Sequence, residues 1–215
     1  MERKDVQKAL EEIKKDSNKR NFVQSYDLII NLKNLDLKKP DQQLDFFAEI
    51  PNERGKQVKV CALIGAESTD EAKDADGVIV SDDFDKYKDK KEAKKLAKAY
   101  DFFVAQANMM GQIAGTFGRI LGPRNKMPNP KAGCVVPPKT NLKPLIERLQ
   151  KLIRVTAKKK QEVQVRVGTE KMEDEKIIDN VMSLYDQVIH HLPQEKNNVR
   201  TIYMKLTMGK PVKVA

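Results

Sequence analysis

The sequence predicts an α/β protein with two domains, in which a domain built from both ends of the chain is interrupted by an inserted one. Strands with one apolar face recur near both ends, at residues 25–32 and 163–167, whereas residues 58–64 are apolar almost throughout. A one-faced strand is typical of a sheet with one side in water, and an apolar strand is typical of a parallel sheet covered by helices. The 215 residues suffice for two modest cores.

The first segment predicts a helix followed by two strands. An apolar stripe at helical spacing indicates a helix that ends near Asn18. This stripe consists of Val6, Leu10 and Ile13. Alternation at residues 25–32 and again at 44–50 predicts two half-buried strands. Since a basic polar loop at residues 38–41 separates them, we expect them to form a hairpin.

The middle segment predicts alternating strands and helices, and therefore a parallel sheet. Strands are expected at 58–64, 78–80 and 101–105, helices at 69–75 and 90–100, and one or two helices at 108–121. Residues 122–138 are dense in Gly, Pro and Asn and predict a long loop. Asn141 is then expected to cap a helix that carries Leu145, Leu149 and Leu152.

The last segment returns to one-faced elements. Residues 163–167 alternate apolar and polar side chains, and a helix with a 3.6-residue apolar period follows. Its apolar residues are Ile177, Val181, Leu184, Val188 and Leu192. A strand at 203–206 ends at Gly209 and Pro211, which break the pattern. We therefore expect the chain to cross between its two domains near Gly55 and near Ile153.

The turn at the end of the last strand carries groups that suit a polyanion. We expect backbone amides to be free there, beside Thr207, Lys205 and Lys210. Exposed amides, a hydroxyl and lysines are the usual donors to phosphate and ribose oxygens. Taken alone, the tripeptide Thr207-Met208-Gly209 is explained better as an ordinary turn that closes a strand.

Composition favours a nucleic acid as partner. Forty-one Lys and Arg residues stand against 31 Asp and Glu residues, so that the net charge is +10 and the pI is near 9.4. No apolar run approaches the roughly 20 residues needed to span a bilayer, and the N-terminus lacks the core of a signal peptide. We expect a cytoplasmic protein that binds no membrane.

Metal, cofactor and catalytic chemistry have little support in the sequence. Cys61 and Cys134 lie far apart, and Cys61 is expected to be a buried hydrophobe. His190 and His191 are consecutive and point in different directions, so neither a metal site nor a catalytic pair is predicted. Four glycines, at 111, 115, 118 and 122, match no phosphate-binding pattern and are expected to serve helix packing and turns. A nucleotide-dependent enzyme built on the middle domain remains the alternative.

Two further features leave alternatives open. The lysines between Lys86 and Lys98 are interleaved with acidic residues, which favours a solvated helix face over an auxiliary RNA contact. Phe22 could stack on a base or anchor the first helix to the sheet, and its local sequence favours the second interpretation.

Several motifs together resemble the family of large-subunit ribosomal protein one, the protein of the mobile side stalk, in its archaeal form. The motifs are Asn21-Phe22, residues 39–42, the Leu-Gly-Pro-x-x-Lys-Met-Pro loop at 121–128, Val167-Gly168, and residues 205–211 around Thr207-Met208-Gly209. Residues 100–105 are also similar to archaeal members. The resemblance covers essentially the whole chain, and the motifs occur in the family's order.

The resemblance implies a discontinuous α/β sandwich domain that binds RNA, residues 1–56 plus 154–215, and an inserted Rossmann-like parallel α/β domain, residues 57–153. The RNA-facing residues it implies are Phe22, Ser25, Lys39, Gly168, Thr207, Met208 and Gly209, with Lys205 and Lys210 beside them. Asn31 stands where some relatives have a lysine.

The function that the resemblance implies is that of a non-catalytic constituent of the large ribosomal subunit. Such a protein binds ribosomal RNA of the side stalk and assists the release of deacylated transfer RNA from the exit site. Members also bind their own messenger RNA as translational repressors. We accordingly expect a monomer off the ribosome, with no cofactor and no metal.

Overall fold

The computed structural model describes residues 1–18, 20–69 and 71–214, so that Lys19, Asp70 and Ala215 lie outside the described residues. The chain forms two compact units. Unit 1 consists of Met1–Lys56 and Lys151–Ala215, and unit 2 of Gln57–Gln150. The chain returns to unit 1 at Lys151, three residues before the predicted position 154, because Leu152 already begins a strand of unit 1.

Unit 1 has two long helices that bury apolar stripes. Helix α1 (Arg3–Asp16) buries Val6, Leu10 and Ile13, as predicted, and ends two residues before Asn18. Helix α5 (Asp174–His190) buries the predicted stripe that begins at Ile177. Both helices contribute to one hydrophobic core with the strands of this unit.

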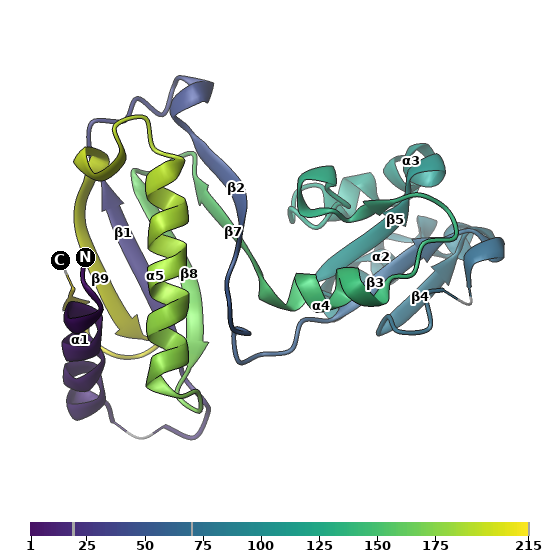
Figure 1. Cartoon of the computed structure of the whole chain (residues 1–215). Helices are drawn as coiled ribbons and strands as arrows, with labels where there is room; N and C mark the ends of the chain where they lie inside the picture. Colours follow the sequence, from purple (N-terminus) through teal and green to yellow (C-terminus); the bar gives the residue numbers. More distant parts are fainter. Residues whose placement is uncertain (19, 70, 215) are drawn as a thin grey trace. The chain divides into compact units, whose positions relative to one another are not determined.

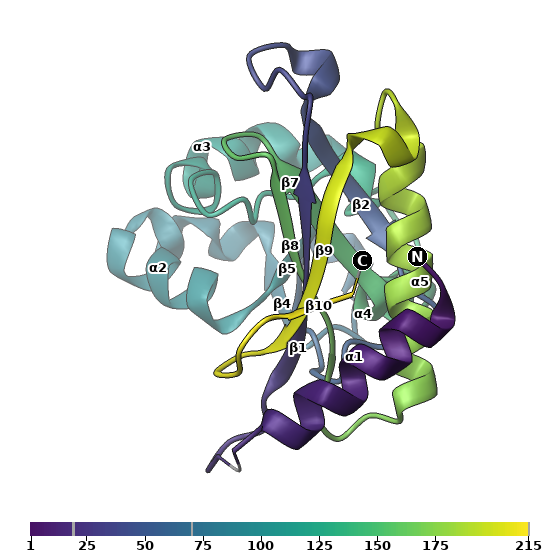
Figure 2. The ribbon, with the colours of Figure 1, turned by 90° about the vertical axis from the view of Figure 1, so that its left-hand side faces the viewer.

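The main sheet of unit 1 is antiparallel, with the strand order β10-β9-β1-β8. Its strands are β1 (Ser25–Leu32), β8 (Glu162–Thr169), β9 (Val199–Leu206) and β10 (Val212–Lys213). Helices α1 and α5 lie on one side of this sheet (Figures 1 and 2). Leu28 and Ile30 point into the core on that side, whereas Asp27, Ile29 and Asn31, which alternate with them, are only partly buried. The sheet therefore has one covered face and one open face.

The predicted hairpin is not formed. Strand β2 (Leu44–Glu49) pairs with β7 (Leu152–Ala157) in a separate two-stranded sheet, and β1 pairs with β8 and β9 instead. The Arg154 side chain donates to the Asp45 carboxylate from Nε at 3.0 Å, which adds an ion pair to the β2–β7 ladder. Local alternation predicted both strands but not their partners, because the partner of β2 lies more than 100 residues further along the chain.

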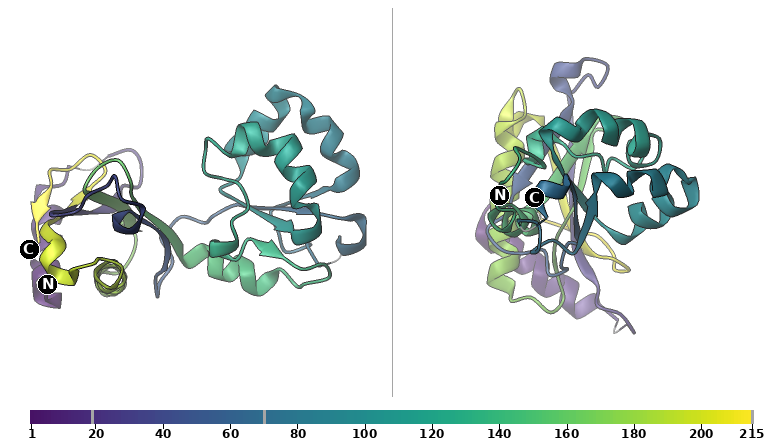
Figure 3. Two further views of the ribbon diagram at one scale, coloured as in Figure 1. Left: turned by 90° about the horizontal axis from the view of Figure 1, so that it is seen from above. Right: turned by 90° about the vertical axis from the view of Figure 1, so that its right-hand side faces the viewer.

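Unit 2 is built on a parallel sheet with the strand order β4-β3-β5-β6. Its elements are β3 (Val60–Ile64), β4 (Gly77–Val80), β5 (Phe102–Gln106), β6 (Val135–Val136), α2 (Lys90–Ala99), α3 (Met110–Leu121) and α4 (Lys143–Lys151). Helices α2 and α3 cover one face and α4 the other (Figure 3). All five residues of β3 are buried, as expected for a central parallel strand. The predicted fold class, a mixed α/β protein with a parallel sheet, is confirmed.

Three local predictions in unit 2 are wrong. The predicted helix at 69–75 is absent from its described residues, which form turns after the 3₁₀ helix Ala66–Ser68; Asp70 of that segment is not described. Leu152 belongs to β7 rather than to the helix that carries Leu145 and Leu149. A Cβ at Gly111, Gly115 or Gly118 would meet nothing within 4 Å, so these glycines do not serve close helix packing.

Other predicted features take simple structural roles. Further 3₁₀ helices lie at Pro40–Gln42, Ser81–Lys88, Ala107–Met109, Pro130–Ala132 and Glu195–Asn198. The Asn141 side chain accepts a hydrogen bond from the Lys143 amide at 3.0 Å, and both cysteines are buried free thiols. His191 stacks on Phe46 with ring centroids 3.7 Å apart.

The described residues contain no helix that is long and apolar enough to cross a membrane. In the same residues, no three His, Cys, Asp or Glu side chains gather in a way that could hold a metal ion.

Candidate nucleic-acid interface

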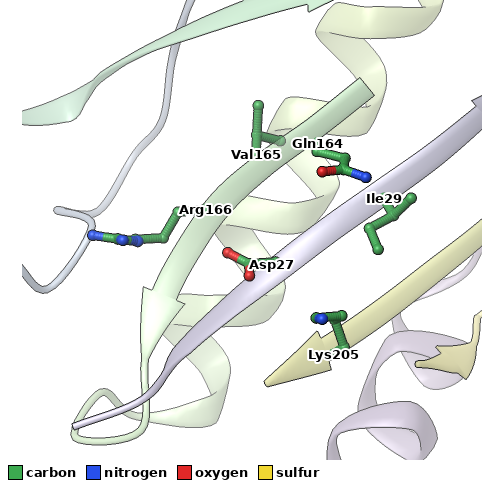
Figure 4. A pocket seen from close by; sticks show the side chains of 6 residues that line it. All are labelled: Asp27, Ile29, Gln164, Val165, Arg166 and Lys205. Carbon is green, nitrogen blue, oxygen red and sulfur yellow. The ribbon is translucent and has the colours of Figure 1, made fainter. Parts of the chain in front are cut away.

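The open face of the unit 1 sheet carries charged and polar side chains from three neighbouring strands. Asp27 on β1 lies opposite Arg166 on β8 and opposite Lys205 on β9. Together with Ile29, Gln164 and Val165 they line a shallow concavity of about 270 Å³ (Figure 4). The open face thus offers two cations and one carboxylate around a partly apolar floor.

Asp27 moderates the charge of this concavity. Burial raises the pKa of the Asp27 carboxyl, and the neighbouring Arg166 and Lys205 cations act in the opposite direction. The two cations outnumber the single carboxylate among the lining residues. The open face is therefore mildly cationic at neutral pH, with the positive groups on the strands that flank β1.

The predicted turn lies at the end of β9, beside the start of β1. The Thr207 amide donates to the Ser25 carbonyl at 3.0 Å, and the Ser25 amide donates to the Thr207 hydroxyl at 3.1 Å. The Met208 amide donates to Oε1 of Gln24 at 3.2 Å, and the Gly209 amide to the Leu206 carbonyl at 3.0 Å. The expectation of free amides beside Thr207 is therefore wrong, because all three are satisfied within the protein.

Gln24 connects the three chain segments that meet at this end of the sheet. Its side chain is only 3% exposed, and its Nε2 donates to Oε1 of Glu170 at 2.8 Å. The backbone amide of Gln24 donates to Oε2 of the same carboxylate at 3.2 Å, and the backbone amide of Glu170 donates to the backbone carbonyl of Gln24 at 3.1 Å. The loop before β1, the end of β8 and the turn after β9 therefore form one ordered rim.

Apolar side chains are exposed on this rim. Phe22, Val23 and Met208 are 51%, 44% and 61% exposed, and the only other exposed large hydrophobic side chain among the described residues is Val78 in unit 2. The local interpretation of Phe22 as a core residue is therefore wrong. We call Phe22, Val23 and Met208, together with Arg20 and Lys210, the apolar end; a concavity of about 280 Å³ adjoins it.

Most residues predicted to face RNA meet at this end. Ser25 and Thr207 are hydrogen-bonded neighbours, Met208 and Gly209 continue the turn, and Lys205 points onto the open face. Lys210 lines the concavity beside the turn with Gly209. The structure thus brings these residues together with Phe22, and their contact with RNA stays a prediction.

Of the remaining predicted residues, Lys39 lies away from this end, and Gly168, which pairs with Tyr26, is buried within it. Lys39 follows the other end of β1 and lies in the loop before Pro40–Gln42; the eight residues of β1, at roughly 3.3 Å each, put roughly 25 Å between the two ends. Gly168 is buried, and a Cβ there would lie 3.1 Å from Cγ1 of Ile177 and 3.3 Å from Sδ of Met172. Gly168 therefore occupies a tightly packed position beside Ile177, and its direct contact with RNA stays a prediction.

The middle of the open face was not among the predicted site residues. Asp27, Ile29, Gln164 and Arg166 alternate with the core residues of β1 and β8. The period of two in these strands was visible in the sequence and marks every second residue as outward. Which outward residues share one surface depends on the register of β1 with β8 and β9, which the sequence pattern does not contain.

The fold and this surface define the class of the chain, a two-unit α/β protein in which the antiparallel sheet of unit 1 has one open face. The sequence profile of the ribosomal protein L1p/L10e family matches residues 4–210, and the chain belongs to this family. It is 40% identical to large ribosomal subunit protein uL1 of Methanobrevibacter smithii over 213 residues, 98% of both chains. It is 41% identical to uL1 of Nanoarchaeum equitans, over 96% of this chain and 99% of that one.

A third archaeal relative, uL1 of Pyrococcus horikoshii, is 38% identical over 99% of this chain and 96% of its own. Family membership confirms the resemblance that the motifs predicted, in its archaeal form. It also confirms that the chain is not an enzyme, so the nucleotide-dependent alternative is abandoned. The chain is a ribosomal protein, and its place is on the ribosome in the cytoplasm.

Proposed function

We propose that the chain is a constituent of the large ribosomal subunit that binds ribosomal RNA of the side stalk through unit 1. The relatives named above are large-subunit proteins. The observation that carries the RNA site is the apolar end, where Phe22 and Met208 are exposed on an ordered rim beside Arg20 and Lys210. On this proposal, residues 1–56 and the C-terminal segment form the RNA-binding domain, and the middle segment is an inserted domain.

The groups at the apolar end and on the open face beside it have distinct roles in the proposed complex. The Phe22 ring stacks on a base or ribose, and the Met208 side chain packs on a sugar or base face. Lys205, Arg166 and Lys210 neutralise phosphates. The Thr207 hydroxyl donates to the Ser25 carbonyl at 3.3 Å, so its oxygen rather than its proton is offered to a ribose hydroxyl.

The finer functions implied by the family resemblance belong to the same proposal. The protein assists release of deacylated transfer RNA from the exit site, and it binds its own messenger as a repressor by presenting the ribosomal site to a similar RNA fold. An ordered rim supports this reuse, because one rigid surface recognises one RNA shape wherever that shape occurs. Off the ribosome the protein is expected to be a monomer.

The test removes the two exposed apolar side chains. A Phe22→Ala, Met208→Ala double variant should lose at least about thirtyfold in affinity for a stalk RNA fragment, since stacking of one base is worth about 1–3 kcal/mol. Val78→Ala is the matched control, because Val78 is the exposed hydrophobic residue of unit 2. Fluorescence anisotropy with labelled RNA measures both, and circular dichroism checks the fold. Equal affinity of the double variant and the control would refute the site.

Repression is tested by competition. The unlabelled stalk RNA fragment should displace the labelled leader of the protein's own messenger, and the double variant should lose affinity for both RNAs by similar factors. Simultaneous binding of the two RNAs to one protein molecule would contradict the proposed mimicry.

A further inference from the structure

The end of the open face opposite the apolar end holds a third concavity, larger than the two described above. It measures about 490 Å³, and its lining residues include Asn31, Lys160, Glu162, Arg200, Thr201 and Tyr203. Asn31 donates from Nδ2 to the Thr201 hydroxyl at 3.0 Å, and Tyr203 is half-buried beside them. The floor is thus polar with one aromatic ring, and two cations stand at its edge.

The edge of this concavity is ordered by side chains that bond to backbone groups. The Leu32 amide donates to the Gln161 carbonyl at 2.8 Å, and Nε2 of Gln161 donates to the Leu35 carbonyl at 2.6 Å. Asn198 is 1% exposed and donates from Nδ2 to the Lys33 carbonyl at 3.0 Å. The loop after β1, the β7–β8 connection and the start of β9 are therefore held together here.

The cations at this edge are available to a ligand. Lys160 and Arg200 are exposed, and among the described residues neither forms an ion pair. Their neighbour Lys158, by contrast, lies 2.6 Å from Oδ2 of Asp45. The carboxylate of Glu162 is the one acidic group in the lining, and it accepts a hydrogen bond from Gln164. A ligand that brings phosphates would meet more positive than negative charge.

We propose that this concavity, here called the basic end, grips the sugar–phosphate backbone of the same ribosomal RNA that the apolar end binds, and does so without reading base sequence. The inference rests on the proposed function. Lysine and arginine bind phosphate, and the Asn31, Thr201 and Tyr203 groups suit ribose oxygens. The length of β1 sets the two contacts roughly 25 Å apart on one RNA.

Lys39 lies in the loop that follows this end of β1. The family resemblance marks Lys39 as RNA-facing, and the structure places it in the loop that begins at Lys33, whose carbonyl is held by Asn198. The loop that carries Lys39 therefore starts beside the basic end and not at the apolar end. The denser lysine run of unit 2 is a poorer candidate, because Lys86, Lys88 and Lys95 each pair with an acidic residue three positions earlier, at 2.6–2.7 Å.

Salt dependence separates the two contacts. In a plot of the logarithm of affinity against the logarithm of salt concentration, affinity decreases as salt increases. The magnitude of this slope decreases by roughly 0.7–0.9 for each phosphate contact removed. A Lys160→Gln, Arg200→Gln variant should therefore bind the stalk RNA fragment with a slope lower by roughly 1.5, whereas Phe22→Ala, Met208→Ala should weaken binding at an unchanged slope. The matched control is Lys94→Gln, Lys98→Gln on α2, which removes the same charge from unit 2.

The outcomes are distinct. A lower slope for the Lys160→Gln, Arg200→Gln variant supports the inference when the Lys160→Arg variant, which keeps the charge, retains the slope of the wild-type chain. A slope equal to that of the α2 control overturns it while leaving the apolar end intact. A slope change seen with deacylated transfer RNA alone overturns the assignment to ribosomal RNA. Failure of the wild-type chain to bind the stalk fragment at all refutes the proposed function itself.

Discussion

The two units use their sheets in opposite ways. In unit 1 the antiparallel sheet has helices on one face only, so that Asp27, Ile29 and Asn31 alternate with core residues and remain partly exposed. In unit 2 the parallel sheet is covered on both faces, and every residue of β3 is buried. Each unit has its own hydrophobic core.

This difference explains where a large partner can bind. A sheet covered on both faces keeps only its strand ends and its helices for contacts, whereas a one-sided sheet presents rows of side chains at fixed spacing. The ordered rim and the three concavities described above belong to unit 1, whose sheet is one-sided. The following predictions test whether binding and stability divide between the units in this way.

Alkaline pH should destabilise unit 2 first. Burial raises the pKa of the Cys61 thiol to about 12. Burial likewise raises the pKa of the Cys134 thiol to about 11, opposed by the Asn129 backbone and Arg148. In the unfolded chain both ionise near 9.0. Because the folded values are raised, the contribution of these thiols is complete below that pH and is lost as the pH rises above it.

Between about pH 8 and about pH 10 the free energy of unfolding of unit 2 should fall by about 3 kcal/mol. Unit 1 contains the buried Tyr26, whose pKa burial raises to about 12 from 10.0, so it should lose little in this range. Urea unfolding followed by circular dichroism measures the change. A Cys61→Ala, Cys134→Ala variant should lose much less between the two pH values; an equal loss would show that the thiols are not the cause.

Removing the Lys126 ammonium should weaken unit 2 alone. Nζ of Lys126 donates to the carbonyls of Ala97 at 2.9 Å and Tyr100 at 2.6 Å, where α2 ends. Lys126→Met keeps the apolar stem and removes both bonds, which should cost about 2 kcal/mol.

Alkylation of Cys61 and Cys134 reports the opening of unit 2, since both thiols are buried there. The rate should rise roughly thirtyfold in Lys126→Met and hardly at all in Lys131→Met, a control from the same loop. RNA affinity should stay unchanged in both. Loss of RNA binding in Lys126→Met would break the division of roles between the units.

Adding a methyl group at two glycines should have opposite effects in the two units. Gly168→Ala places its Cβ against the fully buried Ile177 and should destabilise unit 1 by about 1–2 kcal/mol. Gly115→Ala meets open space in α3 and should stabilise unit 2 by about 0.5–1 kcal/mol. Thermal unfolding measures both. If Gly168→Ala instead keeps its stability and loses RNA affinity, the residue contacts RNA after all.

Deletion of unit 2 should have the smallest effect on RNA binding. A chain that joins residues 1–56 to residues 151–215 retains the core of unit 1, the apolar end and the basic end. Its affinity for the stalk RNA fragment should lie within about threefold of the full chain, a change below about 1 kcal/mol. A folded deletion chain that no longer binds would place the principal contacts in unit 2.

The sequence predicted the elements well where burial follows a local period. Leu28 and Ile30 on β1, the run Val60–Ile64, and the stripe of α5 from Ile177 to Val188 are buried as their spacing indicates. The apolar stripe of α1 is another such case. These patterns are local, so they can be read without knowledge of the partner.

What the sequence could not supply are the long-range pairings. Strand β2 pairs with β7, so the predicted hairpin of β1 and β2 is wrong. The backbone amide of Met208 donates to the side chain of Gln24, 184 residues away. This bond is one reason why the amides expected to be free have partners within the protein. Lys39 lies at the far end of β1 because the loop after Leu32 leads away from the rim. The motif resemblance pointed to the turn at residues 207–209, but only strand pairing reveals which residues surround it.

The closed hydrogen bonding of the rim has a consequence for turnover between RNA molecules. The amides of Thr207, Met208 and Gly209 have hydrogen-bond partners within the protein. Dissociation of the RNA therefore leaves none of these three amides without a partner. The free protein does not have to order this turn again before the next encounter, so the speed of rebinding should depend on diffusion and charge rather than on a folding step. A molecule released from one ribosome is then competent for another at once.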